Sequence, residues 1–161
     1  TESNLYDVTS DELQESGTTA QRKSDILAAL NLADGWLIKL YPGEKSLSAP
    51  VLFYKTAYFT TFSPIAAADP CDARFGTARM YALDYTTGNA VFNLDLTNDS
   101  GGIKVERSDR SEVIGTAIPS GVIITFLQGT GVAYTGVGGG VDMPPLPNTK
   151  SLVPIYWRIV F

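Results

Sequence analysis

PVLFYKTAYFTTF at residues 50–62 and RMYALDYTTGNAVFNL at residues 79–94 carry the strongest secondary-structure signals in the chain. In the first, two short apolar runs flank Tyr54-Lys55-Thr56, a pattern that predicts a β-hairpin. In the second, a strand at residues 79–84 leads through a turn at residues 86–89 into another strand at residues 90–94. The order hairpin, strand, turn, strand predicts a four-stranded antiparallel unit.

The chain before this unit is predicted to hold a loop and one short helix. Residues 1–18 are polar, and Leu5, Tyr6 and Val8 are the side chains expected to anchor this loop. A helix is expected at residues 19–34, with Thr18 or Thr19 as its N-cap and Asp34-Gly35 at its end. Its apolar stripe repeats at helical spacing, through Ile26, Leu27, Leu30 and Ala33.

Residues 35–161 are predicted to be β structure throughout. Short strands are expected at residues 36–40 and 155–161, and a second hairpin pairs residues 122–127 with 132–135. The last strand is expected to pair with the sheet of this second hairpin and to bury Trp157. Turns and loops are expected where glycine, proline and polar residues gather, at residues 41–44, 63–76, 95–111 and 136–148.

Repetition of the antiparallel unit predicts an incomplete β-propeller. One full unit is followed by the start of a second, and residues 36–40 resemble the outer strand of an earlier one. Units of this kind are propeller blades, and a propeller closes with at least ~4 of them. A chain with about two blades is then a single segment, 1–161, of a larger protein. A self-contained β-sandwich built from the same strands is the alternative.

Composition excludes several classes of function. The chain has 161 residues, a net charge of -5 and no histidine, so Ser-His-Asp catalysis and His-ligated metals are ruled out. Twelve basic residues in an acidic chain argue against nucleic acid as a partner. The longest apolar run is much shorter than the ~20 residues of a membrane span. The start of the chain does not have the pattern of a signal peptide.

Two long stretches resemble a family of bacterial surface proteins. GWLIKLYPGEKSLSAPVLFYKTAYFTTFSP at residues 35–64 and DPCDARFGTARMYALDYTTGNAVFNL at residues 69–94 are similar to the C-terminal region of the PilC/PilY family, the type IV pilus biogenesis factors and tip-associated adhesins. Residues 109–126 and Tyr156-Trp157-Arg158 add weaker similarity.

The resemblance implies a modified, quinoprotein-like β-propeller at the C-terminus of a longer secreted protein. It also implies a place at the pilus tip or outer membrane of a Gram-negative bacterium, in assembly, opposition to retraction and surface adhesion. Its partners would be the rest of its own polypeptide or other pilus components, with self-association as a further expectation. No enzymatic activity, catalytic residue, metal or cofactor is expected.

A quinone-type propeller oxidoreductase is the main competing interpretation, and a secreted carbohydrate-binding β-domain is another. Strands like Tyr81-Ala82-Leu83-Asp84 recur in quinone-dependent dehydrogenases. The motif has a purely structural explanation, since Asp84 and Thr86 can cap the turn and Gly88 can supply its positive φ. A quinone site also needs residues from many blades, and this chain supplies about two.

Residues 95–106 form the sole candidate for a metal loop. Asp95, Thr97 and Asp99 alternate as calcium ligands do, and Glu106 stands at the twelfth position. Ser100 occupies the sixth position, where glycine normally allows the sharp turn. The prediction is therefore a solvated acidic turn with no calcium binding at sub-millimolar concentration.

Three further features are assigned structural roles. Cys71 is predicted to be an inert loop thiol or to pair outside this segment. The glycine run at residues 138–140 lacks the lysine and helix start of a phosphate loop. Most aromatic side chains alternate along strands and are expected in the core, whereas Tyr41 and Tyr85 are expected at the surface. The core set is Tyr58, Phe62, Tyr81, Phe92, Phe126, Tyr134 and Trp157.

Overall fold

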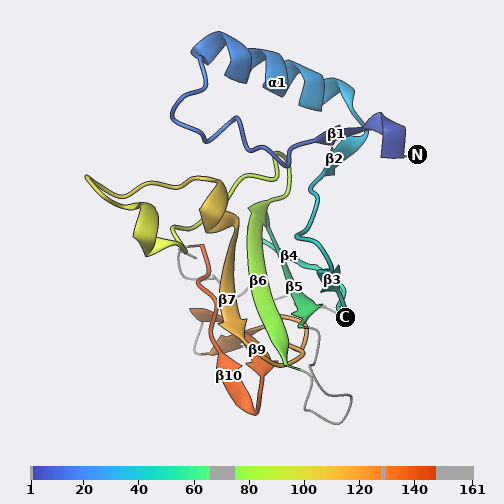
Figure 1. The fold of residues 1–161 in the computed structure, drawn as a ribbon, viewed down its shortest axis with the longest axis vertical. Coiled ribbons are helices and arrows are strands. Elements are labelled where there is room, and N and C mark those ends of the chain that lie inside the picture. The colour runs from blue at the N-terminus through green and yellow to red at the C-terminus, as the bar shows by residue number, and fades with distance from the viewer. Residues whose placement is uncertain (1, 66–74, 128–129, 148–161) are drawn as a thin grey trace, which may run out of the picture.

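The computed structural model describes residues 2–65, 75–127 and 130–147, and this part is mainly β with one α-helix (Figure 1). The helix is α1 (Ala20–Leu32), and three short 3-10 helices are η1 (Glu2–Asn4), η2 (Leu96–Asn98) and η3 (Arg107–Arg110). The strands are β1 (Leu5–Asp7), β2 (Gly35–Leu37), β3 (Lys45–Ser46), β4 (Val51–Phe53), β5 (Thr56–Pro64), β6 (Gly76–Asp84), β7 (Ser111–Gly115), β8 (Ile123–Leu127), β9 (Thr130–Val137) and β10 (Gly140–Asp142).

The larger sheet is antiparallel and has the order β3-β5-β6-β7, with β4 also paired to β5. The predicted first hairpin is confirmed, because β4 and β5 pair with Phe53 opposite Thr56. Its two-residue turn holds Tyr54 and Lys55 at φ 44° and 66°. Positive φ at both positions is the type I′ geometry that matches the twist of a hairpin.

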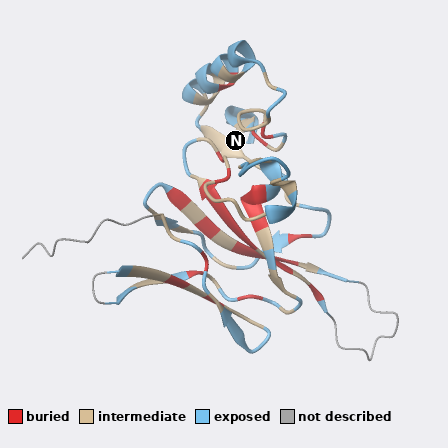
Figure 2. Cartoon of the chain, turned by 90° about the vertical axis from the view of Figure 1, so that its left-hand side faces the viewer, coloured by how far each residue is buried: buried red, intermediate tan, exposed pale blue. Residues whose placement is uncertain are grey.

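The smaller sheet has the order β10-β9-β8 and packs face to face on the larger one (Figure 2). The predicted second hairpin is confirmed, with Ile123 opposite Tyr134. The core lies between the sheets, where buried Tyr58, Met80 and Ala82 of β5 and β6 meet Val122 and Ala133. Burying these side chains on both sheets is the main favourable term that holds the layers together.

The N-terminal residues form a β-α-β unit, which corrects two predictions. Residues 5–7 are a strand rather than loop, although Val8 is a buried anchor as expected. The strand expected at residues 36–40 is β2, which ends at Leu37 and pairs in parallel with β1. It is therefore not the outer strand of an antiparallel blade. A parallel pair needs a crossover connection, and α1 supplies it.

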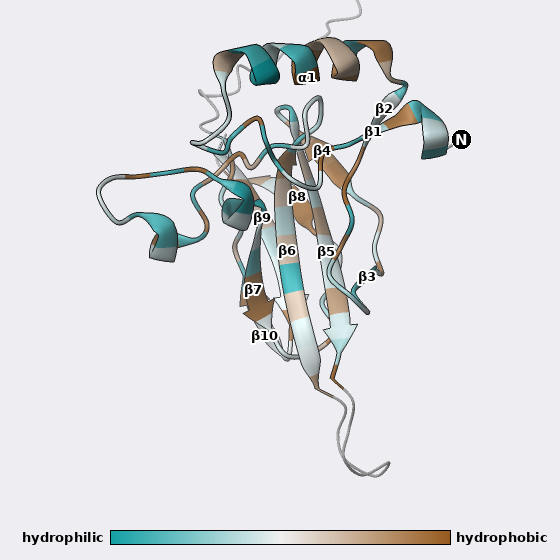
Figure 3. Ribbon diagram, turned by 45° about the horizontal axis from the view of Figure 1, so that its top comes forward, coloured by the Kyte–Doolittle hydropathy of each residue, from teal (hydrophilic) through white to brown (hydrophobic). Residues whose placement is uncertain are grey.

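Helix α1 confirms the helix predicted at residues 19–34, but the reason for its end is different. Thr19 is the N-cap, and its Oγ1 accepts a hydrogen bond from the Arg22 N–H at 3.2 Å. The C-cap is Ala33 in extended backbone, so Gly35 is not needed in a left-handed conformation. Of the expected apolar stripe, Ile26 alone is buried, and Leu27 is exposed. The helix lies beyond the end of the larger sheet, hydrophilic at its start and apolar toward its end (Figure 3).

Three strand assignments in the second half of the chain are corrected. Residues 90–94 form no strand, and Ala90 makes only an isolated bridge with Leu83. The partner of β6 on that side is β7, in a stretch where no strand was predicted. Strand β10 also lies in a predicted loop, since Gly138 and Gly139 at φ 57° and 84° turn the chain back onto β9. The predictions for Cys71 and for the strand at residues 155–161 lie outside the described residues.

No helix in the described part of the chain is long and apolar enough to cross a membrane.

Candidate functional site

The side chains of the predicted acidic loop accept hydrogen bonds from the protein itself. Asp95 Oδ1 accepts from the Thr97 N–H at 3.0 Å, and Asp99 Oδ1 accepts from the Lys104 N–H at 2.8 Å. The bonds from Thr97 lower the pKa of Asp95, as expected where the ionised form is the acceptor. Among the described residues, no three His, Cys, Asp or Glu side chains gather as metal ligands would.

The fully buried carboxylate of Asp109 accepts hydrogen bonds from three residues of this loop. Its Oδ1 accepts from the Asp95 N–H at 2.7 Å, and its Oδ2 accepts from Asn98 Nδ2 and from the Glu106 N–H, both at 2.8 Å. Two of these donors belong to the turn of η2 and the third to Glu106, and charge-assisted hydrogen bonds of this kind are strong. Asp95 and Glu106 are thus tied to Asp109 through their backbones, and the loop has a structural explanation.

The turn after β6 confirms the structural interpretation of its motif. Asp84 Oδ1 accepts from the backbone N–H groups of Thr86 and Thr87 at 2.9 and 3.0 Å. Gly88 has φ 69°, as the turn was expected to require. A Cβ at Gly88 would stand 2.8 Å from Val8 Cγ2, so this turn also holds the N-terminal unit against the sheet.

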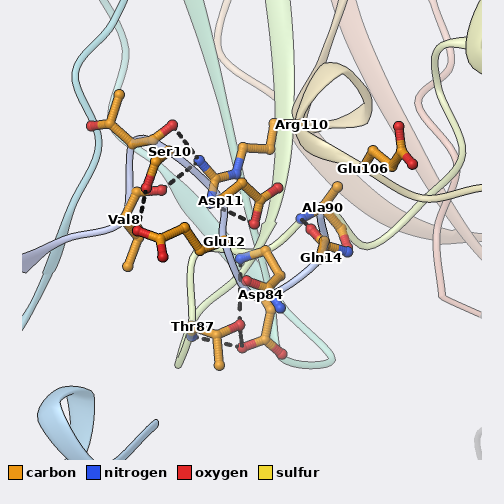
Figure 4. A network of polar contacts seen from close by, with 12 residues as sticks. Val8, Ser10, Asp11, Glu12, Gln14, Asp84, Thr87, Ala90, Glu106 and Arg110 are labelled. Carbon is orange, nitrogen blue, oxygen red and sulfur yellow. Dashed lines mark hydrogen bonds and ion pairs between the residues drawn. The ribbon is translucent and has the colours of Figure 1, made fainter. Parts of the chain in front are cut away.

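A buried ion pair joins the N-terminal unit to the start of β7. Arg110 Nη2 lies 3.1 Å from Asp11 Oδ1, and both side chains are almost fully buried (Figure 4). Arg110 Nη1 also donates to the Val8 carbonyl at 2.8 Å. Asp11 has φ 56°, a left-handed conformation that costs an ordinary residue about 1–3 kcal/mol. The strain persists because the surrounding contacts fix Asp11 in place.

Burial dominates the electrostatics of this pair. It raises the pKa of Asp11 to about 6 despite the adjacent guanidinium, and it lowers the pKa of Arg110. Both shifts have the sign expected when charged groups leave water. A buried ion pair of this type is weak evidence for added stability, because the cost of desolvating both charges can exceed their attraction.

Two further contacts complete the attachment of the N-terminal unit. Gln14 exchanges two hydrogen bonds with the backbone of Ala90, at 3.0 and 2.6 Å. Trp36 Nε1 donates to the Tyr85 carbonyl at 2.8 Å. No pattern in the sequence linked these residues, which are tens of positions apart in each pair. A cavity of about 30 Å³ lies beside the Arg110 side chain. Its lining residues include Lys39, Tyr81 and Arg110, and it has room for about two water molecules.

The outer face of the smaller sheet is largely apolar and carries no charged side chain. Ile124 packs on the core with Ala133 opposite it, so the alternate residues of β8 and β9 point away from the core. This outer face comprises Ile123, Thr125, Leu127, Thr130, Val132, Tyr134, Gly136 and Val141. It carries no Lys, Arg, Asp or Glu, and three of its large apolar side chains are more than half exposed: Ile123, Leu127 and Val141. An antiparallel sheet that faces water normally alternates apolar and polar residues, so this outer face is the leading candidate for a binding surface.

The predicted aromatic core is confirmed in part. Tyr58, Phe62 and Tyr81 are buried and Phe92 packs against the core, whereas Phe126 is 47% exposed and Tyr134 lies on the outer face of the smaller sheet, so the prediction is wrong for these last two. Trp157 lies outside the described residues. Tyr41 and Tyr85 are exposed as expected, and the Arg79 guanidinium lies 4.7 Å from the centre of the Tyr41 ring. Phe126 lies on β8, which is an edge strand of the smaller sheet in the described part of the chain.

Comparison with known proteins gives no assignment: no family model, no curated protein and no solved structure matches this chain.

Proposed function

We propose that this chain is a non-enzymatic interaction module of type IV pilus assembly and tip-associated adhesion, the C-terminal propeller part of a protein of the PilC/PilY kind. The resemblance of residues 35–64 and 69–94 supports this family. The proposal places the chain outside the cell, at the pilus tip or outer membrane of a Gram-negative bacterium. Its partners are the rest of its polypeptide or other pilus components.

The apolar outer face of the smaller sheet is the observation that carries the proposal. A propeller blade packs on a neighbour on both sides, so both of its faces are apolar. Strands β4 to β7 follow one another in space in the order of the chain, as blade strands do, and the smaller sheet packs on them. In this interpretation the outer face receives the next blade or a pilus component.

Binding to type IV pili tests the proposal. Pili sheared from the bacterium that encodes the chain are passed over the immobilised, purified protein. The outer-face variant Ile123→Lys/Val141→Lys is expected to bind at least tenfold more weakly than the parent. Leu32→Lys is the matched control, because Leu32 is an 89% exposed apolar residue on α1, away from the smaller sheet.

Two results would contradict the proposal. One is the absence of any pilus binding by the parent, and the other is an equal loss of binding in the control. A parallel assay with added pyrroloquinoline quinone and Ca²⁺ separates the oxidoreductase alternative. The proposal predicts no reduction of an electron-accepting dye in the presence of alcohols or sugars.

A further inference from the structure

The cavity beside Arg110 has a basic lining, although the chain as a whole has a net charge of -5. Among the described residues that line it, none is Asp or Glu, and three are positively charged: Lys39, Arg107 and Arg110. Four others carry a hydroxyl group, which can donate a hydrogen bond. We call this space the basic cavity. Cationic side chains and hydroxyl groups together are the donors that bind anions in proteins.

Arg110 forms the buried side of the basic cavity and has unused hydrogen-bond donors. Its Nη1 donates to the Val8 carbonyl at 2.8 Å, which fixes the guanidinium (Figure 4). Its Nη2 lies 3.1 Å from Asp11 Oδ1 without the alignment of a hydrogen bond. Its Nε has no hydrogen-bond partner in the part of the chain that the structure describes. Since buried donors are normally paired, an acceptor in the cavity would complete the pairing of this guanidinium.

The other two cations are exposed and stand at the mouth of the basic cavity. Lys39 Nζ lies 2.8 Å from Asp7 Oδ2, so its charge is already balanced. Arg107 makes no ion pair with any described residue. Arg107 is therefore the charge at the mouth that an incoming anion would neutralise.

The hydroxyl groups around the basic cavity also favour an anion. Thr9 Oγ1 accepts from the Lys39 N–H at 2.8 Å, so its own O–H remains a donor for a further acceptor. Tyr81 donates to both oxygens of Glu44, at 3.1 Å each. The Glu44 carboxylate therefore lies behind Tyr81 and does not line the cavity.

The size of the basic cavity suits a carboxylate group. Its volume of about 30 Å³ has room for about two water molecules, and a carboxylate presents two oxygens on one carbon. Sulfate and phosphate carry four oxygens and need more space. We propose that the basic cavity binds one carboxylate group of a ligand, between Arg110 on the buried side and Arg107 at the mouth. None of its described lining residues belongs to β8, β9 or β10, so this inference does not depend on the proposed pilus function.

Titration of the purified full-length chain with sodium acetate, followed by NMR at about pH 8, tests the site. Sodium chloride at the same ionic strength is the reference, because it screens charges equally. Saturable shifts beyond those in chloride are expected at the Arg110 Nε–H and at the backbone amides of Lys39 and Ser111. Sulfate is expected to bind more weakly than acetate. A glutamate with blocked termini separates the two sources of a carboxylate: tighter binding than acetate identifies an acidic side chain of a protein, and weaker binding identifies a free organic acid.

Two variants with opposite expected effects locate the anion. Arg107→Gln is expected to bind acetate about three- to fivefold more weakly, the contribution of an exposed ion pair. Arg22→Gln is the matched control, because it makes the same charge change on α1, outside the cavity lining, and it is expected to leave binding unchanged. Asp11→Asn removes the negative charge that competes for Arg110 and is expected to bind acetate about threefold more tightly.

Four results would overturn the proposal. Acetate shifts no larger than those in chloride would leave water as the occupant of the cavity. Tighter binding of sulfate than of acetate would contradict the match in size to a carboxylate. An equal loss of binding in Arg22→Gln and Arg107→Gln would reduce the effect to net charge. Unchanged or weaker binding by a folded Asp11→Asn variant would show that the anion does not meet Arg110.

Discussion

Individual side chains attach the N-terminal β-α-β unit to the larger sheet. These contacts could not be predicted from the sequence. Asp11 and Arg110 are both buried and lie 3.1 Å apart at their nearest polar atoms. A charged residue gives no local sign of a partner about a hundred positions away. Asp84 and Gly88 were predictable because their hydrogen bonds and φ are set within one turn.

The raised pKa of Asp11 predicts an unusual pH dependence of stability. The pKa is about 6 in the folded protein and 3.8 as the ordinary value, so the folded state favours the protonated carboxyl. The contribution of Asp11 to stability is therefore fully present below about pH 4 and falls as the pH rises to about 6. The loss is at most about 3 kcal/mol. Denaturant unfolding of the parent and Asp11→Asn across this range measures it as the difference between the two.

The same measurement of unfolding against pH on Arg110→Met tests how the guanidinium affects the pKa of Asp11. Without the guanidinium, burial acts on Asp11 unopposed, so its pKa rises further and the fall in stability moves to higher pH. If the parent and Asp11→Asn show the same pH profile, Asp11 does not titrate in this window and the burial argument is wrong.

The acidic loop at residues 95–106 is predicted not to bind calcium. The Asp95 and Asp99 carboxylates already accept bonds from Thr97 and Lys104, so a cation would have to displace internal donors. Calorimetric titration is expected to give no binding at sub-millimolar calcium. A site that appears in the parent and vanishes in Asp99→Ala would contradict this account of the loop.

Helices and strands were predictable from the sequence where the residues that determine them lie close together in the chain. Both hairpins and the helix followed from runs of apolar residues, a short turn and the Thr19 cap. The strand expected at residues 90–94 failed because Ala90 is held instead by Gln14, a contact with a distant loop. Strand β7 was missed because its five residues, Ser111–Gly115, gain their pairing from β6, far away in sequence. The uncharged outer face of the smaller sheet was not predictable either, since its composition depends on which residues point toward the core.

The turn between β4 and β5 predicts a stabilising double substitution. Tyr54 and Lys55 both adopt positive φ, which suits Asn-Gly much better. Tyr54→Asn/Lys55→Gly is expected to gain about 1 kcal/mol, the relief of left-handed strain less the entropy cost of glycine. That corresponds to a rise in Tm of about 2–4 °C by calorimetry. Lys55→Ala retains the strain and is expected to give no rise, whereas a lower Tm for the Asn-Gly variant would rule out the type I′ turn.

At the scale of the whole molecule, the described residues form two stacked antiparallel sheets and a β-α-β unit attached at one end (Figure 1). Its mainly β character with one N-terminal helix was predictable from hydrophobic periodicity. Its parallel strand pair was not, because each partner has only three residues. The arrangement leaves a face without charges on the smaller sheet, and water contact with such a surface is costly at roughly 25 cal/mol per Å².

Light scattering of the purified chain and of Ile123→Lys/Val141→Lys, from micromolar to millimolar concentration, tests whether the outer face of the smaller sheet binds another protein surface, as we propose. The parent is expected to self-associate as concentration rises, because no other partner is present to cover Ile123, Leu127 and Val141. The variant is expected to stay monomeric with a similar Tm, since both substituted side chains are mostly exposed. A parent that remains a compact monomer over the whole range would contradict the claim and favour a self-contained β-sandwich.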